Sequence, residues 1–123
     1  MPPSIAPWLA VPDASAAVDY YRRAFGAVEL YRLDGDKETI AVAQLSIGGS
    51  VFWVQHDVEA SPKSGSPGSV RMVLSVEDPD STFERAVGAG AEVIAAVHEE
   101  HGWRTARVMD PFGHDWELSK QLL

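Results

Sequence analysis

The chain has 123 residues, of which 46% are hydrophobic, enough for one compact core and too little for two independent ones. Its formal net charge of −8 disfavours nucleic acid and anionic membranes as partners and suits a neutral or cationic small molecule. With no cysteine, the chain has no disulfide, thiolate metal site or cysteine nucleophile. No apolar run approaches the ~20 residues that span a bilayer and no signal-peptide pattern is seen, so we expect a cytoplasmic protein.

Apolar patterning and turn residues predict the elements of the first half. An apolar run at 5–11 indicates a strand, and Asp13 follows it as the N-cap of a helix that Gly26 ends. Three more strands are then predicted, separated by turn residues, at 28–32, 39–47 and 50–56.

The second half repeats this order. A strand is predicted at 70–76, and Asp78 caps a helix that ends near Gly88. Three strands complete the half, at 92–97, 103–109 and 114–119. Between the halves, residues 57–69 are rich in Pro, Gly and Ser, which predicts a linker or mobile loop.

The two halves match each other, which predicts an internal duplication. The V-x-D at each helix start matches at an offset of 65 residues, and the glycine turn before each last strand matches at an offset of 64. We therefore expect a single domain made of module 1 at 1–56, the linker at 57–69 and module 2 at 70–123.

A family resemblance rests on two stretches of sequence. They are A-V-P-D-A-S-A-A-V-D-Y-Y-R-R-A-F-G-A at 10–27 and W-R-T-A-R-V-M-D-P-F-G-H-D-W-E-L at 103–118. With the paired βαβββ order, they resemble the vicinal-oxygen-chelate superfamily, which includes glyoxalase I, bleomycin-resistance proteins and extradiol dioxygenases, and look most like its PhnB-like branch. The resemblance implies an α+β fold in which two βαβββ modules form a curled mixed sheet with a concave cup.

The resemblance also raises the question of a metal, because in that superfamily the first and last strands of each module can each supply one ligand. The matching positions here are Ala6, Trp53, Arg71 and Glu117. Only Glu117 matches a family ligand, since alanine and tryptophan side chains do not coordinate a divalent ion and a guanidinium repels one. We expect no metal and no cofactor; a divalent metal at other positions is the less favoured alternative.

Other metal-binding side chains lie in less suitable places. Strand alternation puts Trp53 and Gln55 on one face and His56 on the other, so that Gln55 is at most a weak ligand and His56 lies outside the cup. The H-E-E-H at 98–101 lacks the spacing of H-E-x-x-H and is expected to be a solvated hairpin loop. His114, alone at a strand start, is expected to be structural.

Aromatic residues are the first candidate ligand-binding residues. Trp8 and Trp53 are expected to line one side of the cup beside Gln55, where indole faces suit an aromatic, heterocyclic or cationic ligand. Core packing or a dimer contact would explain the same tryptophans. The segment 99–104 is a second aromatic candidate, as a mobile loop that closes over a ligand through Trp103.

Arg71 and Glu117 are the polar candidates. They would either bind a polar group of the ligand or form an internal salt bridge with each other. If the protein is an enzyme, Glu117 is the candidate catalytic residue, with Arg71 as anion stabiliser in a metal-free reaction.

Two function classes follow. The first is a metal-independent small-molecule binding protein of the bleomycin-resistance type, which sequesters an aromatic or cationic drug or metabolite, such as an antibiotic, in a cup at a homodimer interface. The alternative is a metal-dependent lyase, isomerase or dioxygenase of the glyoxalase superfamily. The sequence favours the binding protein, because three of the four ligand positions are unsuited to a metal.

Overall fold

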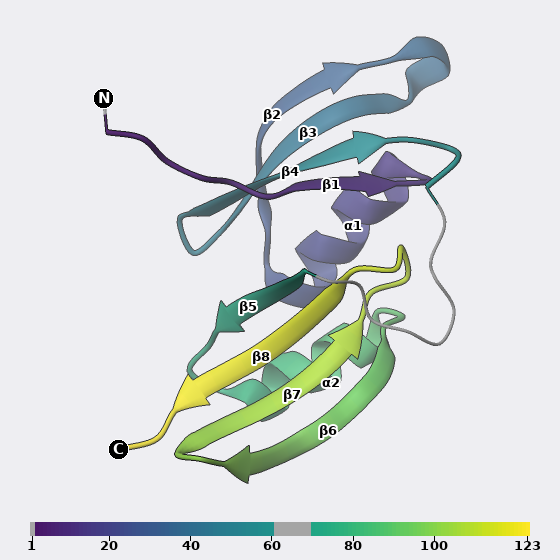
Figure 1. The fold of residues 1–123 in the computed structure, drawn as a ribbon. Helices are drawn as coiled ribbons and strands as arrows, with labels where there is room; N and C mark the ends of the chain where they lie inside the picture. The colour runs from purple at the N-terminus through teal and green to yellow at the C-terminus, as the bar shows by residue number, and fades with distance from the viewer. Residues whose placement is uncertain (1, 61–69) are drawn as a thin grey trace. The chain divides into compact units, whose positions relative to one another are not determined.

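Figure 1 shows the computed structural model of the protein, which describes residues 2–60 and 70–123. Among these, residues 2–22 and 26–60 form one compact unit, unit 1, and residues 23–25 and 70–123 form a second, unit 2. From residue 61 on, the predicted linker lies outside the described residues.

Unit 1 contains one four-stranded sheet and a helix. Its elements are β1 (Trp8–Val11), α1 (Ala14–Phe25), β2 (Val28–Asp34), the short 3₁₀ helix η1 (Asp36–Glu38), β3 (Ile40–Ile47) and β4 (Ser50–His56), with the last three residues of α1 assigned to unit 2. The strand order is β1-β4-β3-β2, with β1 and β4 parallel and the other neighbours antiparallel. The ladder between β1 and β4 begins at Pro7, which has no N–H to donate, so β1 is shorter than the predicted strand.

Unit 2 has the same topology. Its elements are β5 (Arg71–Ser75), α2 (Pro79–Gly88), β6 (Glu92–Glu100), β7 (Trp103–Met109) and β8 (Asp115–Gln121). The strand order is β5-β8-β7-β6, again with one parallel pair, β5 and β8. The predicted α+β fold of two βαβββ modules is therefore confirmed. No helix in the described part of the chain is long and apolar enough to cross a membrane.

The duplication extends to strand register. In unit 1, Trp8 lies opposite Trp53, and in unit 2, Val73 lies opposite Glu117. The predicted offsets of 65 and 64 residues relate the first pair to the second. Trp53 and Glu117 thus occupy equivalent places in the two sheets.

Both helices begin at the predicted caps. The Asp13 side chain accepts a hydrogen bond from Ala16 N at 3.1 Å, and Asp78 accepts one from Ser81 N at 3.2 Å. Gly26 ends α1 at φ 70°, a left-handed conformation that glycine adopts without strain.

Each sheet buries one face against its own helix. In unit 1, Tyr21 of α1 packs edge-to-face on Phe52, and β-strand residues on this side are buried. The opposite side, which we call the aromatic face, carries Trp8, Tyr31 and Trp53. In unit 2, α2 covers the side of Ala106, Val108 and Leu118. We call the side away from α2 the polar face; it carries Thr105, Arg107, Asp115, Glu117 and Ser119.

The hairpin between β6 and β7 corrects one prediction. Residues 98–101 do not form a loop, because His98, Glu99 and Glu100 all pair with β7. The turn consists of His101 and Gly102 alone, at φ 52° and 82°, and two successive left-handed residues of this kind close a two-residue hairpin. The mobile loop expected at 99–104 is therefore wrong, and Trp103 is the first residue of β7.

Candidate functional site

Three aromatic rings form a continuous surface on the aromatic face. The rings of Trp8 and Trp53 stack with centroids 5.7 Å apart and planes inclined by 26°. Tyr31 meets Trp53 edge-on, with a centroid separation of 6.2 Å. Trp8 is 54% exposed and Tyr31 49%, so both rings are open to solvent. We call Trp8, Trp53 and Tyr31 the aromatic row.

Gln55 orients the ring of Trp8, at one end of the aromatic row. Trp8 Nε1 donates to Gln55 Oε1 at 2.7 Å. Gln55 lies two residues beyond Trp53 on the same strand face, so the bond runs along the aromatic face rather than through the sheet. The structure thus brings together the three predicted residues of module 1, and it adds Tyr31, which the sequence analysis missed.

The His56 side chain binds the start of α1 and does not lie on the aromatic face. Its Nδ1 accepts a hydrogen bond at 3.1 Å from the backbone N–H of Ala14, the first residue of α1. The prediction that His56 lies on the opposite strand face from Trp53 is confirmed, and this ring nitrogen is used as a helix cap.

Arg71 and Glu117 meet on the polar face. Arg71 Nη1 donates to Glu117 Oε1 at 3.0 Å, with the two side chains 45% and 23% exposed. The predicted pairing is present. At this exposure a single ion pair contributes only ~0–1 kcal/mol to the free energy of folding. The pair therefore adds little to stability.

Polar groups missed by the sequence analysis surround this pair. Arg107 lies opposite Glu117 and its Nη2 donates to Asp115 Oδ2. Thr105, Asp115 and Ser119 are at least nine-tenths buried. Four buried atoms have no hydrogen-bond partner within the described residues: Thr105 Oγ1, Arg107 Nε, Asp115 Oδ1 and Ser119 Oγ.

These atoms have a physical consequence, because each buried polar atom without a partner costs about 1–3 kcal/mol. The polar face therefore has unused donors and acceptors that water or a polar ligand can satisfy. The sequence contained the signal, since polar residues alternate with apolar ones along β8 as D-W-E-L-S at 115–119.

Trp103 lies elsewhere on unit 2. It is 39% exposed and lies four residues from Arg107 along β7. Its partner Gln121 lies four residues from Glu117 along β8. The structure does not place its indole beside the Arg71–Glu117 pair.

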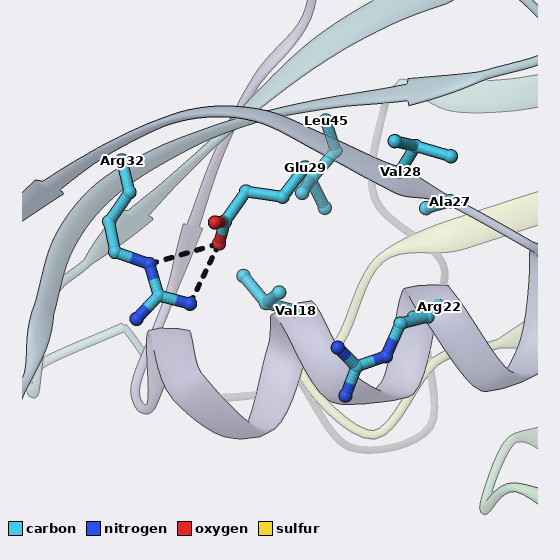
Figure 2. Close-up of a pocket in the computed structure, with 7 residues that line it drawn as sticks. All are labelled: Val18, Arg22, Ala27, Val28, Glu29, Arg32 and Leu45. Carbon is cyan, nitrogen blue, oxygen red and sulfur yellow. Dashed lines mark hydrogen bonds and ion pairs between the residues drawn. The ribbon is translucent and has the colours of Figure 1, made fainter.

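A small cavity lies on the opposite side of the unit 1 sheet from the aromatic row, between α1 and β2 (Figure 2). Its volume is about 230 Å³, below the roughly 300–1,000 Å³ of typical ligand pockets. It is lined by Val18, Arg22, Ala27, Val28, Glu29, Arg32 and Leu45. Glu29 accepts from Arg32 Nε and Nη2 at 3.0 and 2.8 Å, which raises the pKa of Arg32. None of the predicted site residues lines this cavity.

The H-E-E-H segment forms its own contacts. A hydrogen bond to the backbone carbonyl of Ala96 raises the pKa of His98, and the nearby carboxylate of Glu100 raises it further. Arg104 binds Glu99 at 3.0 Å and holds both carboxylate oxygens of Asp80, at 2.6 and 2.7 Å, which lowers the pKa of Asp80. These contacts join β6, β7 and the start of α2.

The family model of the Glyoxalase/Bleomycin resistance protein/Dioxygenase superfamily matches residues 4–118. The chain belongs to this superfamily. A protein of Mycobacterium bovis named uncharacterized protein Mb0911c is 40% identical over 126 residues, covering 96% of this chain and 83% of its own length. The predicted resemblance is confirmed.

Two solved structures have a similar fold. TioX from Micromonospora sp. ML1 is 31% identical, with a TM-score of 0.77 over 98% of this chain and 100% of its own. The fosfomycin resistance protein FosX from Listeria monocytogenes is 18% identical, with a TM-score of 0.73 over 100% of this chain and 96% of its own. At that identity FosX shows a shared fold only.

The residues of this superfamily member do not fit the family's metal. Of the four family ligand positions only Glu117 offers a ligand atom, and its carboxylate is engaged by Arg71. Trp53 and the exposed Ala6, which precedes β1, offer none. Across residues 2–60 and 70–123, no group of three or more His, Asp or Glu side chains is arranged to hold a metal ion.

Proposed function

We propose that the protein is a metal-independent small-molecule binding protein of the bleomycin-resistance type, which sequesters an aromatic or cationic drug or metabolite. The observation that carries this proposal is the aromatic row. Three rings lie side by side on one sheet face, and two of them are about half exposed. A folded protein gains nothing from leaving large rings in water, and such patches commonly mark binding surfaces.

The geometry of the row suits a flat ligand. Trp8 and Trp53 already stack on each other, so a ligand lies on the exposed ring faces rather than between the indoles. These faces carry the negative part of the ring quadrupole and attract a cation or the edge of another aromatic ring. Gln44, which lies between Trp53 and Tyr31 in the strand register, adds an amide that can donate or accept.

The polar face supplies the second part of the proposal. We propose that Arg71 and Glu117 contact charged or hydrogen-bonding groups of the ligand. We also propose that the protein holds the ligand as a homodimer. The acidic net charge of −8 favours the cationic members of this ligand class.

Tryptophan fluorescence tests the proposal directly. Titration against a panel of cationic antibiotics and aromatic metabolites is expected to quench the emission with at least one compound. Trp53→Leu should then weaken binding of that compound about 10-fold, because stacking on one ring is worth about 1–3 kcal/mol. Trp103→Leu is the control, since it removes an exposed indole from unit 2. An equal loss in Trp103→Leu, or a panel that leaves the emission unchanged, would contradict the role of the aromatic row.

Metal analysis tests the other half of the proposal. Protein purified without chelator is expected to contain no stoichiometric metal, and calorimetry with Ni, Zn, Mn and Fe(II) is expected to show no tight site. One tightly bound ion per subunit would overturn the metal-independent function and favour a lyase, isomerase or dioxygenase.

A further inference from the structure

The edge strand β2 of the unit 1 sheet exposes four large apolar side chains. β2 pairs with β3 on one side only, and Figure 1 shows it as the last strand of the sheet. All seven of its residues are exposed, and Val28, Leu30, Tyr31 and Leu33 keep between 49% and 59% of their surface in water. An open edge pairs readily with another strand unless it is short, covered, or guarded by charges or a bulge. β2 has both charges and a bulge, but its Glu29 and Arg32 are opposite in sign and can therefore complement a second copy of the strand.

A bulge sorts the side chains of β2 onto two faces. The register with β3 shifts between Glu29 and Tyr31, so one extra residue, Leu30, is inserted there. Glu29 lies opposite Leu45 and Arg32 opposite Ala43, and these two β3 residues share the buried side.

The consequence is that Glu29 and Arg32, three residues apart, share the face towards α1 and form an ion pair at 2.8 Å. Figure 2 marks this contact with dashed lines. In a regular strand they would point to opposite faces. Val28, Tyr31 and Leu33 lie opposite Ser46, Gln44 and Val42 on the aromatic face.

We propose that β2 pairs antiparallel with β2 of a second copy of this chain around a two-fold axis, which joins two four-stranded sheets into one of eight strands. In this register Glu29 of each copy lies opposite Arg32 of the second copy, Val28 opposite Leu33, and Leu30 opposite Tyr31. The strand is then complementary to itself, as a two-fold interface requires. Both charged pairs lie on the α1 side and both Val28–Leu33 pairs on the aromatic face.

Charge and face favour this register over the neighbouring one in which Tyr31 pairs with itself. A shift of one residue puts Tyr31 opposite Tyr31, and then Glu29 lies opposite Leu33 and Leu30 opposite Arg32. Each charge would face an apolar side chain, and Glu29 and Leu33 belong to different faces. Opposite charges across a strand pair stabilise it by ~0.2–1 kcal/mol each, and the proposed register contains two such pairs.

This pairing rests on the homodimer of the proposed function and identifies β2 as its interface. It forms without a ligand. Tyr31 belongs to both β2 and the aromatic row, so the proposed interface lies next to the proposed binding surface. The ligand titration reports on tryptophan emission and the test below on mass, so the failure of one is distinguishable from the failure of the other.

Charge reversal tests the pairing. Wild type is expected to sediment as a concentration-dependent dimer. Glu29→Arg places arginine opposite Arg32, and Arg32→Glu places glutamate opposite Glu29, so each variant alone should dissociate at least 10-fold more readily. An equimolar mixture of the two variants should restore the dimer, because every charged contact in the mixed pair is again between opposite signs.

The mixture isolates the contact between chains. Both variants lose the Glu29–Arg32 contact within the chain, so a dimer recovered only on mixing must come from contacts between chains. Arg22→Glu, which changes an exposed charge on α1, is the matched control and should leave the dimer intact. Circular dichroism checks that each variant is folded. A monomeric wild type, a dimer that persists in both single variants, or a mixture that stays monomeric would overturn the proposal.

Discussion

Asp110 shows how much one buried carboxylate can organise. It is 3% exposed. Its Oδ1 accepts from the backbone N–H groups of Phe112 and His114 at 2.9 and 3.0 Å, and its Oδ2 accepts from Trp116 Nε1 at 2.9 Å. The side chain therefore fixes the D-P-F-G turn and ties it to the core residue that starts the buried side of β8.

Asp110→Ala is expected to lower the free energy of unfolding by about 3 kcal/mol, because three N–H groups lose their acceptor and such a loss costs about 1–3 kcal/mol per buried group. Urea unfolding followed by tryptophan fluorescence measures the change. Asp36→Ala removes an exposed carboxylate from η1 and should change stability by less than about 0.5 kcal/mol. Similar losses in the two variants would show that the acceptor role of Asp110 is overestimated.

The sequence predicted this turn in part. Pro111 and Gly113 indicated its backbone, and the structure has Gly113 at φ 94° with its N–H bonded to Asp110 O at 3.1 Å. The side-chain contacts of Asp110 were not predictable, because an aspartate before proline is typical of any turn and carries no mark of three donors. Only the folded position of Trp116 supplies the third one.

At the scale of elements, the side-chain orientations in β2 could not be predicted from the sequence. Strict alternation would put Tyr31 on the same face as Glu29, and nothing in V-E-L-Y-R-L-D announces that Leu30 is an extra residue. The bulge moves Tyr31 to the aromatic face beside Trp53, where it was not predicted. Trp8, Trp53 and Gln55 were predictable on one face because β1 and β4 pair without a shift.

Asp80 and Arg104 connect α2 to β7 and give a prediction for pH dependence. Arg104 lowers the pKa of Asp80 in the folded protein, so the carboxylate stabilises the fold above its unfolded pKa, and this contribution is lost as pH falls through the folded pKa. Asp80→Asn should therefore be less stable than wild type near pH 7, with a difference that shrinks as pH falls below ~4. Urea unfolding at several pH values measures this difference. Asp36→Asn, at an exposed position with no ion pair to another described residue, is the control variant. A pH-independent loss in Asp80→Asn would rule out the ion pair as its cause.

At the scale of the whole molecule, the duplication was the most predictable feature. The order of elements along the chain, the helix caps and both repeat offsets follow from V-x-D and glycine-turn signals that recur in each half. The side chains on the sheet faces do not repeat in this way, since equivalent positions hold Trp53 in one sheet and Glu117 in the other. The two sheet faces therefore diverged into an aromatic and a polar one while their backbones kept the same register.

Net charge gives the last prediction, because it acts on a ligand regardless of which residues touch it. With a formal charge of −8, the protein should bind a cationic aromatic compound more tightly than its neutral isostere at low salt. Between about 0.01 M and 1 M salt the Debye length falls from about 30 Å to about 3 Å, so affinity for N-methylacridinium should fall about 10-fold while affinity for uncharged acridine changes little. Isothermal titration calorimetry over this range, at a pH where acridine is neutral, measures both. Stacking on the aromatic row is common to the two compounds, so their difference isolates the electrostatic part. Equal affinities with no salt dependence would mean that the ligand class is aromatic and not cationic.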